Sequence, residues 1–247
     1  MEEELQLKKR FSELYERSES RGCYVFTDFL SLAEQDILIR SVPKYSFTFF
    51  GGYENAERKL AVFGNEEKCG YTEEPPAVCV EISPLQQKFA DELTHRDFLG
   101  ALMSLGIKRE TLGDIIVYNN RGYLFCLSSV SRYIVENCVS IKHTTVNCKE
   151  VDSPPVESIA LPDESEIVVP ALRCDAVLAA VYNLSRSESK KFFLQKLVFI
   201  NSACCEDPSR VLKENDIVSL RGKGRFIYCG EKLVTKKNRL RVTVRVF

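Results

Sequence analysis

The stretch Ala171–Phe226, ALRCDAVLAAVYNLSRSESKKFFLQKLVFINSACCEDPSRVLKENDIVSLRGKGRF, decides the fold that we expect for the C-terminal third of the chain. Ser185 and Glu188 have the S-x-x-E spacing of a capping box, which predicts that a helix begins there. Three cations follow in its first turns, at Arg186, Lys190 and Lys191. Because cations at this end oppose the helix dipole, a bound phosphate would offset their cost. The stretch therefore predicts a phosphate site.

A longer pattern runs through the same stretch: R-x-D-x-x-L-A from Arg173, L-S-R-S-x-x-K-K from Leu184, V-x-I-N from Val198, P-S-x-V from Pro208 and N-D-I-x-x-x-R-G-x-G-R-F from Asn215. In this order the pattern resembles the S4 RNA-binding domain. The resemblance implies that the cations and hydroxyls of the pattern contact RNA. The expected contact residues are Arg173, Ser185, Arg186, Ser187, Lys190, Lys191, Lys196, Arg221, Lys223 and Arg225.

The sequence departs from the S4 pattern at two positions. Lys196 and Ser202 stand where the family usually has glycine. Both positions fall at turns, so we expect a backbone that is less tight there than in the family, with the RNA-facing cations kept. The alternative is a small αβ domain whose basic face is merely solvated.

The charge of the chain is unevenly distributed. Residues 171–247 hold 16 Lys and Arg against 7 Asp and Glu, a net charge of +9, whereas the other 170 residues hold 18 against 28, a net charge of −10. Positive charge gathered in one terminal region favours a polyanionic partner, because each neutralised phosphate releases counterions. The overall charge of −1 hides this asymmetry.

The last strand, NRLRVTVRVF, alternates apolar and polar residues and predicts one basic face with three further candidate RNA contacts at Arg239, Arg241 and Arg245. In the preceding RGKGRF turn, Gly222 and Gly224 would let the backbone approach an RNA phosphate. The alternative for the strand is a sheet edge that its charges protect from aggregation.

The first 150 residues predict two α+β modules. In the N-terminal module, residues 1–75, we expect helices over 1–22 and 31–40 and a strand pair at 45–50 and 59–63. In the middle module, residues 76–150, the expected order is strand 77–82, helix 95–105, strands 114–118 and 123–127, helix 129–137 and strand 139–146. That βαββαβ order predicts the split αβ plait of RRM-like domains.

The segment RGYLFCLS at residues 121–128 partly resembles the aromatic third strand of an RRM. Tyr123 and Phe125 would share one face and could stack on bases, although ordinary packing against the sheet is the alternative. After this module, residues 151–170 predict a connector with a short strand pair, Ser158–Leu161 facing Ile167–Val169.

Two longer motifs, GGYENAERKLAVF at Gly51–Phe63 and HRDFLGALMSLGIKRETLGDI at His95–Ile115, precede the S4 pattern. Together, in this order, the three resemble the YlmH family of bacterial S4-domain proteins over nearly the whole chain. The resemblance implies an α+β N-terminal domain, an RRM-like middle domain and an S4 domain at 171–247. It also implies binding to rRNA and tRNA on a large ribosomal subunit that carries obstructed peptidyl-tRNA, in ribosome-associated quality control.

No motif predicts catalysis, a metal or a cofactor. Only Cys204 and Cys205 of the ten cysteines are close in sequence, so no C-x-x-C pair begins a zinc site. The opening MEEELQLKKR lacks the apolar core of a signal peptide, and no stretch has the length and apolarity of a membrane span. We therefore expect a cytoplasmic protein with reduced thiols and no membrane or small-molecule partner.

Two classes of function compete at this point. The first is a non-catalytic RNA-binding factor that recognises structured RNA by shape and phosphate contacts. The second is an RNA-modifying enzyme, a pseudouridine synthase or methyltransferase, with an appended S4 domain. The second class lacks a visible active site, since the two histidines, His95 and His143, stand beside no evident nucleophile.

Overall fold

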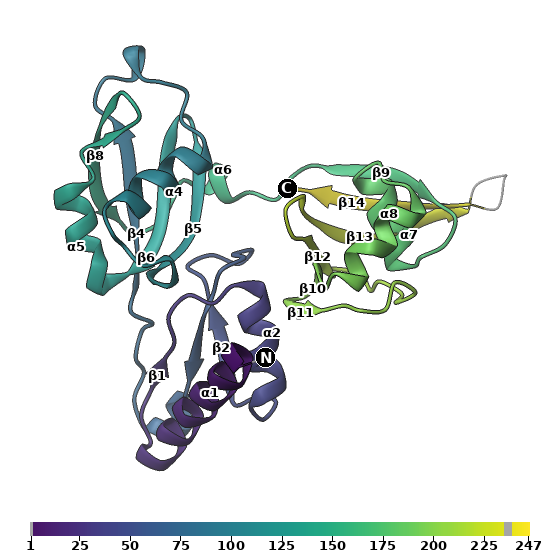
Figure 1. Ribbon diagram of the computed structural model, residues 1–247, viewed down its shortest axis with the longest axis horizontal. Coiled ribbons are helices and arrows are strands. Elements are labelled where there is room, and N and C mark those ends of the chain that lie inside the picture. Colours follow the sequence, from purple (N-terminus) through teal and green to yellow (C-terminus); the bar gives the residue numbers. More distant parts are fainter. Residues whose placement is uncertain (1, 235–238) are drawn as a thin grey trace. The chain divides into compact units, whose positions relative to one another are not determined.

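Antiparallel sheets and the helices that cover them make up the computed structural model, which describes residues 2–234 and 239–247 (Figure 1). The chain divides into two units, residues 1–160 and 161–247. A three-stranded and a five-stranded sheet lie in the first unit, and a six-stranded sheet lies in the second. This arrangement confirms the mixed α and β class that the sequence predicts.

The N-terminal part of the first unit is a small sheet of order β1-β3-β2 with two main helices. Its elements are α1 (Glu2–Arg21), β1 (Val25–Phe26), α2 (Leu32–Ser41), β2 (Phe47–Phe50), β3 (Leu60–Phe63) and the single turn α3 (Glu66–Cys69). Phe11 of α1, Leu38 of α2 and Phe63 of β3 meet in one core. A capping box fixes the start of α2, since Ser31 N–H donates to Glu34 and Ser31 Oγ accepts from Glu34 N–H.

The rest of the first unit follows the predicted βαββαβ order, with a short extra strand before the last one. Its elements are β4 (Ala77–Pro84), η1 (Gln87–Phe89), α4 (His95–Ser104), η2 (Arg109–Thr111), β5 (Leu112–Tyr118), β6 (Arg121–Leu127), α5 (Ser128–Asn137), β7 (Ser140–Ile141) and β8 (Thr144–Val151). The sheet order is β5-β6-β4-β8-β7. Helices α4 and α5 lie on one face of this sheet (Figure 1), and Phe98, Leu102 and Ile134 of these helices belong to its core.

The N-terminal sheet is fastened to the middle sheet around the carboxylate of Asp114. This carboxylate accepts hydrogen bonds from Tyr53 Oη at 2.8 Å, Glu57 N–H at 2.7 Å and Arg58 N–H at 3.0 Å. The Arg58 side chain then donates to the carbonyls of Leu112 and Phe29 at 2.8 and 2.7 Å. Since four of these hydrogen bonds cross between the N-terminal and middle parts, the first unit behaves as one packed body.

The second unit has the sheet order β11-β10-β12-β13-β14-β9, with α7 and α8 packed on it. Its elements are β9 (Glu164–Val169), α7 (Cys174–Val181), α8 (Arg186–Leu194), β10 (Val198–Ile200), β11 (Ala203–Cys204), β12 (Ile217–Leu220), β13 (Gly224–Val234) and β14 (Leu240–Val246). Leu178, Phe193 and Phe226 are buried at the centre of its core.

The structure overturns the prediction for the connector and the alternative given for the last strand. The expected strand pair within residues 151–170 is absent from the described chain, because Val156–Ile159 forms the helical turn α6 and Ile167–Val169 belongs to β9, which pairs with β14. Because β9 pairs with β14, the edge of the six-stranded sheet next to β14 is formed by β9.

Both departures from the S4 pattern take left-handed backbone, where glycine is favoured. Lys196 has φ +57° and follows α8 in a Schellman motif, with Leu197 N–H bonded to Phe192 O and Lys196 N–H bonded to Phe193 O, both at 3.0 Å. Asn201 and Ser202, with φ +50° and +69°, are the two central residues of the hairpin that joins β10 to β11. Both turns close with regular hydrogen-bonded geometry, and their left-handed backbone is strained because these residues carry side chains. The expectation of a backbone less tight than in the family stays a prediction.

We predict that Ser202→Gly raises the free energy of unfolding of the chain by about 0.5–1 kcal/mol, because Asn-Gly is the preferred pair for a hairpin turn with two positive φ angles. Urea denaturation measures the change. Ser209→Gly is the matched control, since Ser209 is exposed and has an ordinary φ, and it should lose a small amount of stability. Equal effects of the two substitutions would contradict this account.

A second prediction concerns the joint in the first unit. Asp114→Ala removes the acceptor of three hydrogen bonds and should lower the free energy of unfolding by about 2 kcal/mol. Glu136→Ala removes only an exposed ion pair with Arg132 within α5 and should change stability by less than about 0.5 kcal/mol. A change at Asp114 as small as that at Glu136 would show that the joint contributes little.

Candidate nucleic-acid interface

The start of α8 is fixed by the predicted capping box. Ser185 N–H donates to Glu188 Oε2 at 2.9 Å, and Ser185 Oγ accepts from Glu188 N–H at 3.2 Å. Hydrogen bonds from Ser185, followed by the positive charges of Lys191 and Lys223, hold the pKa of Glu188 below its usual value. Glu188 thus stays ionised, and the first turn of the helix presents its N–H groups and side chains in one fixed direction.

The cations of α8 lie on its exposed side. Ser189 and Phe193 are buried on the opposite side, where Ser189 Oγ donates to the carbonyl of Asp175 at 2.8 Å. Arg186 and Lys190 are exposed and four residues apart, which places them over one another on the helix surface. Within the part of the chain that the structure describes, no carboxylate lies within ion-pair distance of either. These two charges are therefore available to a polyanion.

The RGKGRF turn between β12 and β13 lies next to the start of α8. Its Lys223 contributes to the lowered pKa of Glu188 in the α8 cap. A Cβ on Gly224 would lie 3.7 Å from the hydroxyl of Tyr182, just before α8. Gly222 and Gly224 have φ +84° and +129°, backbone conformations that favour glycine. The start of α8 and the RGKGRF turn therefore form one surface.

Two further members of the predicted set are held by contacts beside this surface. The backbone N–H of Arg221 donates to the carbonyl of Leu197 at 3.0 Å, which ties the turn to the segment after α8. The guanidinium of Arg225 lies 4.2 Å from the centroid of the Phe247 ring. The sequence gives no local signal for this contact, because Phe247 is 22 positions away from its partner.

Other residues of the S4 pattern have structural roles. Arg173 forms two hydrogen bonds with the buried carboxylate of Asp175, at 3.1 and 3.0 Å. Asn201 bridges two strands, since its side chain donates to Asp216 Oδ1 at 2.8 Å and accepts from Ile217 N–H at 2.9 Å. These residues shape the scaffold that carries the exposed cations.

Several of the remaining candidate cations are paired with acids. Lys196 lies 3.0 Å from Glu206, and both side chains are exposed. On β14, Arg241 pairs with Glu166 at 3.3 Å and Arg245 pairs with Glu164 at 2.9 Å. The expectation of a basic face on this strand is therefore wrong for Arg241 and Arg245, because the neighbouring strand β9 supplies the neutralising carboxylates. Arg239 is exposed at the beginning of this strand.

The two rings that could have stacked on bases are buried. Tyr123 and Phe125 are only 5% and 4% exposed, in a cluster with Phe29 and Leu60 of the N-terminal part. The ring of Phe125 also stacks on Tyr53, with centroids 5.5 Å apart. The alternative of ordinary packing therefore holds, with the N-terminal module as the partner, and we leave both residues out of the RNA interface.

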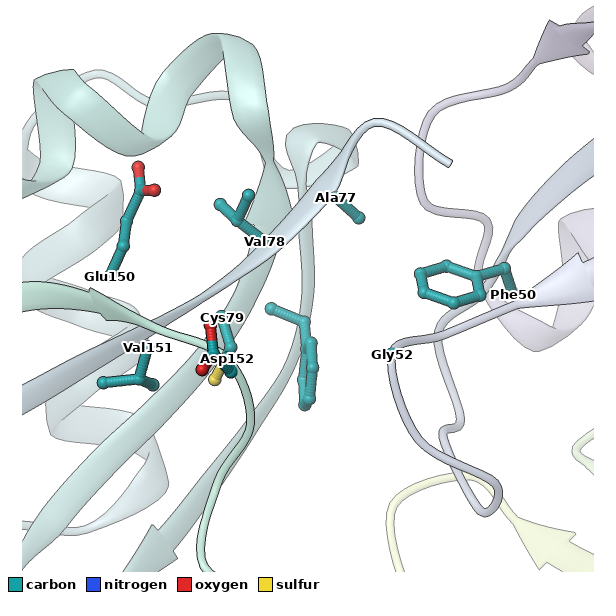
Figure 2. Close-up of a pocket in the computed structure, with 9 residues that line it drawn as sticks. Phe50, Gly52, Ala77, Val78, Cys79, Glu150, Val151 and Asp152 are labelled. Carbon is teal, nitrogen blue, oxygen red and sulfur yellow. The ribbon is translucent and has the colours of Figure 1, made fainter. Parts of the chain in front are cut away.

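A cavity of about 300 Å³ opens beside this cluster. Figure 2 shows Phe50 and Gly52 on one side of it and Val78, Cys79, Val151 and Asp152 on the other. Two acidic residues, Glu150 and Asp152, belong to its lining, and their negative charge disfavours a phosphate there. Burial raises the pKa of Cys79 to about 12, so its thiol stays protonated at neutral pH. The cavity does not extend the cationic surface.

Across residues 2–234 and 239–247, no three His, Cys, Asp or Glu side chains gather in a way that could hold a metal ion. Within the same ranges, no helix has the length and apolar composition needed to cross a bilayer.

Comparison with known proteins adds independent findings. Residues 78–154 match the family model described as "Putative RNA-binding domain in YlmH". The chain is 31% identical over 226 residues to "Ribosome-associated protein quality control protein P2" of Bacillus subtilis (strain 168), a match that covers 88% of this chain and 85% of the relative. The solved structure titled "Cell division protein ylmH from Streptococcus pneumoniae" is 20% identical, has a TM-score of 0.48 and covers 63% of this chain and 93% of its own.

The relative from Bacillus subtilis decides the family, because the similarity extends over most of both chains. The matched RNA-binding domain lies in the middle of the sequence, outside the unit that carries the cationic surface. By these two findings, and in agreement with its sequence pattern, the chain belongs to the YlmH family.

Proposed function

We propose that the protein is a non-catalytic RNA-binding factor that acts on the large ribosomal subunit carrying obstructed peptidyl-tRNA, in ribosome-associated quality control. The observation that carries this proposal is the adjacency of the α8 N-terminus and the RGKGRF turn, which gathers exposed cations on one surface. The name of the relative from Bacillus subtilis supports the ribosomal role. This proposal places the protein in the cytoplasm, with rRNA and tRNA as its partners.

We further infer that the second unit is an S4 domain and that the five-stranded sheet is RRM-like. The first inference is supported by the packing of α7 and the capped helix α8 on the sheet, and by the structural roles of Asp175, Asn201 and Asp216 in the pattern. The second is supported by the βαββαβ order and by the matched family model. The boundaries predicted at residues 75 and 150 remain predictions, while β9 joins the C-terminal sheet.

The mode of binding that we propose is phosphate contact. Arg186, Lys190, Lys191, Arg221 and Lys223 are exposed and would reach the RNA backbone first. The hydroxyls of Ser185 and Ser187 and the N–H groups of the first turn of α8 would add hydrogen bonds to the same phosphates. Lys196 and Arg225 would lie at the rim, and Arg173 would act by positioning α7. Arg239 stays a secondary candidate.

Reversal of the two α8 charges tests this proposal. The double variant Arg186→Glu, Lys190→Glu should bind a large-subunit rRNA fragment roughly tenfold more weakly at moderate salt. Its plot of log affinity against log salt concentration should be flatter by about two units, one for each lost phosphate contact.

The control is Arg17→Glu, Arg21→Glu, which makes the same change of charge at two exposed positions four apart on α1. If both double variants lose the same affinity, the effect is one of net charge alone, and the assignment of α8 as the RNA-contacting helix is wrong.

Absence of catalysis is tested separately. Incubation of the protein with rRNA and S-adenosylmethionine should yield no new methylated nucleoside by mass spectrometry. Carbodiimide labelling should reveal no new pseudouridine, which has the mass of uridine and needs this separate detection. A modification that depends on the protein would replace the present proposal with that of an RNA-modifying enzyme.

A further inference from the structure

The loop that follows β4 carries the most exposed aromatic ring of the five-stranded domain. Phe89, in η1, is 79% exposed, and the neighbouring Leu85 is 66% exposed. The Lys88 ammonium lies 5.7 Å from the centroid of the Phe89 ring. Exposure of a large apolar ring beside a cation calls for an explanation, because burial of its surface would have stabilised the folded chain.

Hydrogen bonds hold this loop in place. Leu85 N–H donates to the carbonyl of Thr145 at 2.9 Å, and Asp91 N–H donates to Thr144 Oγ1 at 2.8 Å. The side chain of Gln87 donates to the carbonyl of Asn119 in the β5–β6 hairpin at 3.1 Å. The ring is therefore presented from a backbone that is tied to two other segments, so that little ordering would be needed on binding.

A cavity of about 230 Å³ lies beside the ring. Phe89 and Leu85 supply its apolar lining, and Gln86, His143 and Thr145 supply an amide, an imidazole and a hydroxyl. Its volume falls below the range of about 300–1,000 Å³ that suits drug-sized ligands. An aromatic wall with a few hydrogen-bonding groups at its edge fits one flat heterocycle.

The position of Phe89 in the domain favours a role in RNA binding. The sheet face that carries Tyr123 and Phe125 is covered by the N-terminal module, so base stacking by this domain must use another surface. The apolar exposure at the loop amounts to one ring and one leucine, surrounded by Gln86, Gln87 and Lys88. A patch that small is unlike the broad apolar patches that mark protein docking sites.

We propose that Phe89 and the cavity beside it bind a single unpaired base of RNA, by stacking on the ring and hydrogen bonds to the edge of the base. This inference rests on the proposed function and deepens it. The cationic surface of the second unit would hold the phosphate backbone, and the loop at residues 85–89 would read an unstacked nucleotide.

The test uses the full chain and two probes: an eight-nucleotide single-stranded RNA of mixed sequence, and an abasic chain of the same length. The unchanged protein should bind the base-containing probe roughly tenfold more tightly than the abasic one. Phe89→Ala should abolish this difference, and Phe89→Tyr should preserve it. Tyr45→Ala is the matched control, because Tyr45 is 87% exposed and has the Lys44 ammonium 5.0 Å from its ring centroid, and it should leave the difference intact.

Equal binding of the base-containing probe by the unchanged protein and by Phe89→Ala would overturn the inference while leaving the proposed function standing. If Phe89→Ala also weakened sedimentation with ribosomes in that case, the loop would be assigned to a protein partner. Failure of the unchanged protein to bind either probe or any rRNA fragment would overturn the inference and the proposed function together.

Discussion

Reciprocal hydrogen bonds between Ser185 and Glu188 are the interaction on which the cationic surface depends. They fix where α8 begins, and with it the side on which Phe193 enters the core and the side on which Arg186 and Lys190 meet water. A shift of one residue in the helix start would rotate these side chains by about 100° around the helix axis. Because the RGKGRF turn lies beside the same helix start, the cap brings together charges that are more than thirty positions apart.

In the first unit, a basic and an acidic side chain have a structural role instead. There the basic side chain of Arg58 and the carboxylate of Asp114 serve as internal fasteners that join the N-terminal and middle sheets. The joint covers one face of the middle sheet and buries Tyr123 and Phe125. The domain that matches the family model therefore has this face of its sheet covered, and its most exposed aromatic ring, Phe89, lies in the loop after β4.

Features that depend on residues close in sequence could be predicted, and those that depend on distant partners could not. The caps of α2 and α8 follow from two residues three positions apart, and the βαββαβ order follows from local patterns of apolar residues. The ion pairs of Arg241 and Arg245 could not be predicted from local patterns, because their acidic partners on β9 are more than seventy positions away in the sequence. The same holds for Tyr123 and Phe125, whose cover comes from residues 29–62.

Sedimentation of the purified protein with isolated ribosomal subunits tests the central claim, that the cations of the second unit bind a ribosomal RNA backbone. In a gradient at low salt the protein should travel with the large subunit, and at high salt it should be released, because phosphate contacts weaken as salt rises. Protein that stays at the top of the low-salt gradient, or that travels with the large subunit equally at low and high salt, would contradict the account.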